Sequence, residues 1–198
     1  MGNDNPQVKL FQIEDLIREL LLAIGEDPDR EGLRGTPQRV AEMYAELTSG
    51  YRISPQELIE GAIFPVEYDE MVLIKDIEFY SLCEHHILPF FGKVHVGYIP
   101  DGRVIGFSKI PRIVDAFARR LQLQERLTEQ IADFLMEAIK PQGVGVVVEG
   151  FHLCMAMRGV RKQEARMVTS AMKGLFRRDA RTRAEFLELI GQGRGWQA

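Results

Sequence analysis

The sequence predicts an α+β fold in which an antiparallel sheet carries helices on one face. From residue 65 onward the pattern reads as strands, a pair of helices, further strands and a final helix, and this order is typical of the α+β class. Before residue 65 the apolar spacing is helical. We therefore expect an N-terminal helical segment over residues 1–64 and a sheet-containing domain over residues 65–198.

Three helices are expected in the N-terminal segment. Apolar residues recur at helical spacing over Ile13–Ile24. A threonine followed by proline then predicts a capped helix over residues 36–48, and a serine followed by proline predicts a short one over residues 54–61. These helices contain no chemical motif, so we expect them to serve packing and assembly.

Strand patterns begin after the proline at position 65. Met71–Tyr80 is β-rich, and Lys93–Ile99 alternates between two faces. The Asp101-Gly102 pair predicts a hairpin turn, with Val104–Phe107 as the return strand of that hairpin. The remaining expected elements are two helices within residues 111–139 with a break near 121–124, strands over 143–157 and 167–172 joined by a hairpin, and a helix over 180–190 before a glycine-rich tail.

Composition and charge exclude several classes of protein. The chain has 198 residues, enough to bury a core, and a formal net charge of −4, whereas general nucleic-acid binders are usually basic. The polar N-terminus carries no signal pattern, and no apolar run is long enough to cross a membrane. We expect a cytoplasmic protein without a nucleic-acid or membrane partner. In that compartment cysteines stay reduced, which disfavours a disulfide.

Residues capable of chemistry are concentrated in two short segments. The chain has only two cysteines and four histidines, yet both cysteines and three histidines fall within residues 83–86 and 152–154. Two hypotheses follow: a metal site built from both segments, or a cysteine pair serving redox or nucleophilic chemistry. If residues 143–157 form one strand, alternation places His152, Cys154 and Arg158 on the same face.

A metal site of this composition would suit zinc. Cys83 and His86 stand at a spacing from which both can reach one ion, and Cys154 would complete a set of three protein ligands. Three ligands with an open fourth position are typical of catalytic zinc, which lowers the pKa of its bound water. A fourth ligand from His85 or His152 would instead close the site, and the spacing leaves both arrangements open.

Two further pairs of residues suggest ligand binding. Lys109 and Arg112 are three residues apart at the start of a predicted helix, so they form either a phosphate site or a solvated basic pair, and Arg158 favours the phosphate site. Gln124 and Glu125 stand where the helical pattern resumes. They either cap that helix or read the donor edge of a guanine.

The chain resembles the GTP cyclohydrolase I family over nearly its whole length, most strongly over residues 78–190. Several long motifs in the same order carry this resemblance. They are Ser81-Leu-Cys-Glu-His-His, Gly92-Lys-Val-His-Val-Gly-Tyr-Ile-Pro100, Gln124-Glu-Arg-Leu-Thr128, Gly143-Val-Gly-Val-Val-Val-Glu149, His152-Leu-Cys-Met-Ala-Met-Arg-Gly159 and Val168-Thr-Ser-Ala-Met172.

The resemblance implies the tunnelling fold, a four-stranded antiparallel sheet with two helices between its strand pairs. It also implies a homodecamer of two five-fold rings, with active sites between subunits. The implied reaction is zinc-dependent hydrolysis of GTP to formate and 7,8-dihydroneopterin triphosphate, the first step of folate and pterin biosynthesis.

Site roles follow by matching positions in the motifs. The implied zinc ligands are Cys83, His86 and Cys154. The implied proton-transfer residues are His85, which protonates N7 of the purine, and His152 with Ser108, which act in later steps. The implied substrate-binding residues are Gln124 and Glu125 for guanine, and Lys109, Arg112 and Arg158 for the triphosphate.

Two positions depart from the family pattern. Phe107 replaces the usual leucine, and Pro111 is unexpected. Because both flank the phosphate region, we expect altered detail there with activity retained.

Two alternative functions compete with this interpretation. One is that of another tunnelling-fold enzyme, such as a nitrile reductase with a cysteine nucleophile. The other is that of a zinc-stabilised protein that binds a purine nucleotide without turnover.

Overall fold

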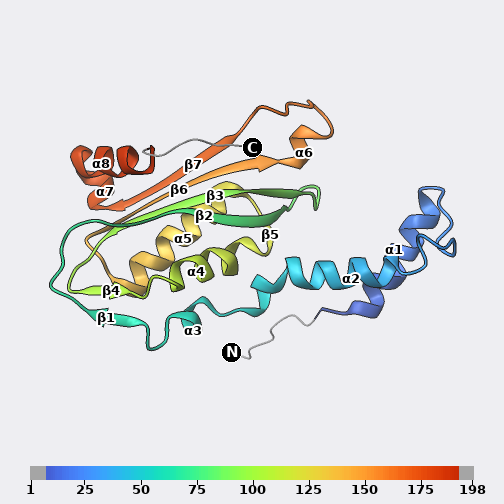
Figure 1. Cartoon of the computed structure of the whole chain (residues 1–198), viewed down its shortest axis with the longest axis horizontal. Coiled ribbons are helices and arrows are strands. Elements are labelled where there is room, and N and C mark those ends of the chain that lie inside the picture. The colour runs from blue at the N-terminus through green and yellow to red at the C-terminus, as the bar shows by residue number, and fades with distance from the viewer. Residues whose placement is uncertain (1–7, 192–198) are drawn as a thin grey trace.

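A computed structural model describes residues 8–191 of the chain, and it divides into a sheet-containing body and a projecting helical arm (Figure 1). The polar residues 1–7 and the expected glycine-rich tail, residues 192–198, lie outside the described part. Within residues 8–191, no helix is both long enough and apolar enough to cross a membrane.

The expected N-terminal helices are all present. The projecting arm consists of α1 (Leu10–Ala23) and α2 (Thr36–Leu47), while the 3-10 turn η1 (Ser49–Arg52) and α3 (Pro55–Ile59) lie against α4 (Lys109–Ala118) of the body (Figure 1). The Ser54 hydroxyl caps α3 by accepting from the backbone N–H of Glu57 at 3.4 Å, as predicted. The predicted cap on α2 is wrong: Thr36 is already helical, and Gly35, which has no side chain to accept a hydrogen bond, occupies the cap position.

The body is built on a five-stranded sheet in the order β5-β2-β3-β6-β7. Four of its strands pair antiparallel, which confirms the predicted sheet; they are β2 (Val72–Cys83), β3 (Pro89–Ile99), β6 (Gly143–His152) and β7 (Met167–Gly174). The predicted break between the two helices is the short strand β5 (Leu121–Gln122). It pairs in parallel with the last two residues of β2, so the sheet is mixed.

The predicted hairpin after Ile99 is wrong in its pairing. The strand β4 (Arg103–Ile105) pairs with β1 (Ile63–Pro65) in a separate two-stranded sheet. The physical reason is that β3 is already paired on both edges, with β2 and with β6, so a return strand finds no free edge there.

The predicted strand over residues 143–157 is also too long. It ends at His152, and residues Leu153–Ala156 form the short helix α6. His152 is paired with Phe90, so the next ladder position would oppose Pro89, which has no N–H to donate. The predicted alternation of faces therefore fails beyond His152, and Cys154 is placed by a helical turn.

Helices cover both faces of the sheet, whereas the sequence predicted one. The helices α4 (Lys109–Ala118) and α5 (Gln124–Ile139) pack on one face and share the main core with β2, β3 and β6 (Figure 1). The helices α7 (Leu175–Arg178) and α8 (Ala180–Gly191) cover part of the other face. Gly97 permits this contact, because a Cβ at that position would lie 2.8 Å from the Phe186 ring.

Candidate metal centre and surrounding site

The turn between β2 and β3 brings Cys83 and His86 together. The backbone N–H of Cys83 donates to Leu88 at 2.9 Å, and that of Ile87 donates back to the Cys83 carbonyl at 2.8 Å. This tight turn holds Ile87 at a φ of 56°, in the left-handed region. As a result Nδ1 of His86 lies 3.9 Å from Sγ of Cys83.

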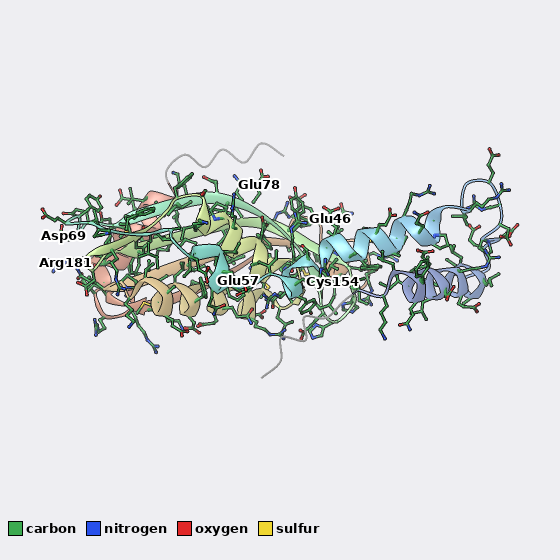
Figure 2. All side chains as sticks on the ribbon, turned by 90° about the horizontal axis from the view of Figure 1, so that it is seen from below. Glu46, Glu57, Asp69, Glu78, Cys154 and Arg181 are labelled. Atoms are coloured by element: carbon green, nitrogen blue, oxygen red, sulfur yellow. The ribbon has the colours of Figure 1, made fainter. Side chains whose placement is uncertain are left out.

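Cys154 joins this pair from α6. The ligand atoms of Cys83, His86 and Cys154 all lie within 4.8 Å of one another, and no other group of this kind occurs within residues 8–191. Both thiols are free, so no disulfide forms. In Figure 2, Cys154 lies at the end of the body from which the arm projects.

The donor set fits a soft divalent metal ion. Two sulfur atoms and one ring nitrogen converge to within 4.8 Å of one another. Tetrahedral coordination at zinc–ligand distances of about 2.0–2.3 Å places ligand atoms about 3.3–3.8 Å apart, so a small inward movement of these side chains would complete the site. Burial is the main cause that raises the pKa of the Cys154 thiol, and the neighbouring Cys83 raises it further. A cation between the sulfurs would favour the thiolates that burial disfavours.

Charged side chains surround this cluster on the exposed side. Nη1 of Arg158 lies 2.9 Å from Nε2 of His86 and donates to it. The exposed His85 ring stands edge-on to His86, with centroids 6.2 Å apart. The carboxylate of Glu84 accepts from Arg126 of α5 at 2.7 Å, and this ion pair lowers the pKa of Glu84.

His152 lies half-buried at the end of β6, next to the start of α5. Its ring is parallel to that of Phe90, with centroids 4.6 Å apart and 6° between the planes. Its Nε2 is 2.9 Å from Oε1 of Gln124. Burial lowers the pKa of His152, and the charge of Glu125 opposes that shift.

The neighbours Gln124 and Glu125 differ sharply in accessibility. Gln124 is 1% exposed, and its amide nitrogen donates to Val148, Met167 and Thr169. The carboxamide therefore has no polar atom without a protein partner. Glu125 is exposed, so its carboxylate remains accessible to a ligand.

Of the predicted triphosphate residues, the structure brings Arg158 to the cluster but not Lys109 or Arg112, and the predicted proton-transfer residue Ser108 lies with the latter two. Ser108, Lys109 and Arg112 lie at the start of α4. The far end of that helix leads into β5, which pairs with Cys83 (Figure 1). Ten helical residues span about 15 Å, so one helix length separates the basic pair from the strand beside the cysteines.

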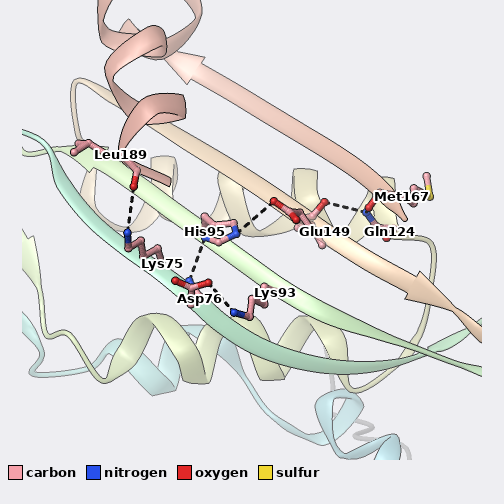
Figure 3. Close-up of polar contacts among 9 residues, drawn as sticks. Lys75, Asp76, Lys93, His95, Gln124, Glu149, Met167 and Leu189 are labelled. Atoms are coloured by element: carbon pink, nitrogen blue, oxygen red, sulfur yellow. Dashed lines mark hydrogen bonds and ion pairs between the residues drawn. The ribbon is translucent and has the colours of Figure 1, made fainter. Parts of the chain in front are cut away.

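The fourth histidine has a different environment. His95 is 2% exposed; its Nδ1 accepts from the backbone N–H of Asp76 at 3.1 Å, and its Nε2 lies 3.8 Å from the carboxylate of Glu149 (Figure 3). Lys93 pairs with Asp76 at 2.9 Å in the same group. This histidine belongs to the sheet and not to the metal cluster.

Sequence reasoning missed three residues that support the site. Arg126 holds Glu84, Phe90 stacks on His152, and Thr169 accepts from Gln124. A correct strand register would have indicated Phe90, because it is paired directly with His152. Nothing in the local pattern indicates Arg126 or Thr169, since each contacts a residue more than 40 positions away.

Comparison with known proteins yields a family model and many similar chains. The model described as GTP cyclohydrolase I matches residues 13–191. The GTP cyclohydrolase 1 of Chlorobaculum tepidum is 56% identical over 190 residues, covering 96% of this chain and 85% of the relative. That of Leptospira biflexa is 59% identical over 181 residues, covering 91% of this chain and 99% of the relative.

Among solved structures, the archaeosine synthase QueF-Like in the apo form matches with a TM-score of 0.43 and 24% sequence identity. The match covers 52% of this chain and 93% of that one.

Proposed function

The chain belongs to the GTP cyclohydrolase I family, and from this premise we propose that it hydrolyses GTP to formate and 7,8-dihydroneopterin triphosphate. This product would enter folate or pterin biosynthesis. The observation that carries the proposal at the site is the convergence of Cys83, His86 and Cys154 beside an accessible His85.

Zinc is the proposed metal, held by Cys83, His86 and Cys154. When bound there, zinc would supply Lewis-acid activation of water near neutral pH. An open fourth position is supported by the geometry, because neither His85 nor His152 belongs to the group of ligand atoms that lie within 4.8 Å of one another. The free thiols of this site suit the reducing cytoplasm, which is the proposed compartment.

Two histidines would move protons during the reaction. His85 is exposed beside His86, so it can reach N7 of a purine placed over the cluster and donate a proton to it. His152 would serve the later transfers that reclose the ring, together with Ser108. Because burial lowers the pKa of His152, the neutral ring would be available near pH 7 to accept a proton.

Glu125 would supply the acceptors for the guanine. Its carboxylate is exposed at the first turn of α5, where it can accept from the donor edge of the base. Gln124 lies next to it at the same end of the helix. To contact guanine through its side chain, Gln124 would have to give up a buried hydrogen bond.

The triphosphate would be bound by Arg158 together with Lys109 and Arg112 of a neighbouring subunit. One helix length separates the latter two from the cysteines in a single chain, so an assembly must supply them. Within residues 8–191 the outer edge of β7 is unpaired and β5 pairs with only the last two residues of β2, and these open edges support such an assembly. The tunnelling fold and a homodecamer with active sites between subunits are the proposed arrangement.

The test is to incubate the full-length protein with GTP, follow formate release and pterin fluorescence, and measure zinc per subunit. We expect turnover with about one zinc per chain, and loss of both in Cys154→Ala. Tight GTP binding with zinc but without formate would support a nucleotide-binding protein instead. Turnover of a nitrile substrate without zinc would support a cysteine nucleophile.

A further inference from the structure

The side-chain amide of Gln124 has one favourable orientation. Its Nε2 is 3.1 Å from the carbonyl oxygen of Val148 and 3.0 Å from that of Met167 (Figure 3). Carbonyl oxygens only accept hydrogen bonds, so the NH₂ group must face them. The reverse orientation would place Oε1 against two acceptors in a site that is 1% exposed, where water cannot compensate.

A chain of hydroxyl groups requires the same orientation. The Thr128 hydroxyl donates to the backbone oxygen of Gln124 at 2.7 Å, and this uses its single hydrogen. The 2.6 Å contact between Thr128 and Thr169 must then use the hydrogen of Thr169. The Thr169 oxygen is left as an acceptor, 3.2 Å from Nε2 of Gln124, where it shares one of the two amide hydrogens with a carbonyl oxygen.

With the amide held in this way, Oε1 of Gln124 faces Nε2 of His152 at 2.9 Å. An amide oxygen only accepts, so Nε2 of His152 must carry a hydrogen. In the neutral ring, Nδ1 is then the unprotonated nitrogen. Within residues 8–191, no hydrogen bond is made to Nδ1.

We propose that Gln124 is a positioning residue that holds His152 in its Nε2–H form and leaves Nδ1 to exchange protons with the substrate. The proposal rests on the proposed function for the part that His152 plays in the reaction. It assigns Gln124 to the orientation of the catalytic histidine and leaves the reading of guanine to Glu125.

Two further contacts hold the ring in place. The parallel stack on Phe90 fixes the plane of the imidazole. Gly150 leaves room for the bridge between the two side chains, because a Cβ there would lie 2.1 Å from Oε1 of Gln124 and 3.4 Å from Nε2 of His152. Stack and hydrogen bond together leave the ring one orientation with Nε2 toward Gln124.

The direct test is the tautomer of His152 in the full-length, zinc-loaded protein. The chain has four histidines, so ¹⁵N-histidine labelling gives a small set of ring signals, and His152→Asn identifies those of His152. We expect a protonated Nε2 and an unprotonated Nδ1. A neutral His152 with its hydrogen on Nδ1 in the native protein would overturn the proposal, and this measurement needs no disruptive variant.

Gln124→Met and Gln122→Met form a matched pair for the kinetic test. Gln122 is also buried, at 2% exposure, and its amide donates to Phe117 and to Gln130 without contacting His152. We expect Gln124→Met to yield a mixture of tautomers and to lower kcat at least about tenfold, with the KM for GTP changed less than about threefold. Gln122→Met should keep the native tautomer.

The alternative outcomes separate the hypotheses. A raised KM with unchanged kcat in Gln124→Met would mean that Gln124 reads the substrate, and the proposal would fail. An unchanged tautomer in that variant would also refute it. If the native protein released no formate, the proposed function would fail, while the tautomer of His152 would still be measurable and would test the hydrogen-bond assignment by itself.

Discussion

Arg126 and Glu84 form a 2.7 Å ion pair that ties the first turn of α5 to the turn carrying Cys83 and His86. The two residues are 42 positions apart, and each lies next to a residue of the proposed active site. A second connection reinforces the first, because the backbone N–H of Glu84 donates to Gln122 of β5 at 3.1 Å. The candidate metal ligands and the proposed substrate-binding residue Glu125 of α5 are thereby held in fixed positions relative to each other.

Breaking this ion pair should weaken metal binding modestly. Arg126→Met leaves the backbone connection through Gln122 intact, so we expect zinc affinity to fall only about two- to fivefold. Arg119→Met is the matched control, since Arg119 also makes ion pairs, with Glu46 and Asp115, without contacting the turn. Competition with a chromogenic chelator measures the zinc affinity of both variants. Equal zinc affinities in Arg126→Met and Arg119→Met would contradict the role given to Arg126.

The two adjacent histidines should separate metal binding from proton transfer. His86→Asn removes a proposed zinc ligand, so both bound zinc and formate release should be lost. His85→Asn should retain about one zinc per chain while formate release falls by about 10²–10⁴-fold, the range typical of a lost general acid. Metal analysis of the two purified variants decides the matter, and loss of zinc from His85→Asn would make His85 a ligand.

Two inactive variants should restore activity when they share one assembly. Lys109→Ala and Cys154→Ala each remove one half of the proposed site, and the two halves would come from different subunits. Co-expressed subunits that mix at random should recover roughly a quarter of the native activity, because that fraction of sites receives both intact partners. Failure of verified mixed oligomers to release formate would place both halves in one chain.

Gly97→Ala should destabilise the protein. The added methyl group would lie 2.8 Å from the Phe186 ring, so α8 must shift from the sheet, at a cost of about 1–3 kcal/mol in the free energy of unfolding. Gly191→Ala is the control: Gly191 lies in helix α8, and an added Cβ there would meet no atom of residues 8–191 within 4 Å. Thermal unfolding should show a lower Tm for the first variant only, and equal values would contradict the packing argument.

The sequence by itself determined the order of the elements and the chemical character of the site. Apolar periodicity located α1, α2, α4, α5, α8 and the four antiparallel strands, because burial of one face of an element spaces its apolar residues regularly. It missed the short helices α6 and α7. The clustering of Cys83, His86 and Cys154 indicated either a metal site or a reactive cysteine pair, and the family resemblance favoured the metal site.

Only the tertiary structure decided which partners those residues meet. The strand predicted over 143–157 ends at His152 because its neighbour begins with Pro89, and this placed Cys154 on a helical turn. The predicted hairpin after Ile99 did not form because β3 is already paired with β2 on one edge and with β6 on the other. Gln124 was predicted to cap a helix or to read guanine, yet its amide is engaged by Val148, Met167 and His152, residues far from it in the chain. Hydrogen bonds between distant residues depend on which segments the fold brings together, and the local apolar periodicity of each segment does not indicate its partner.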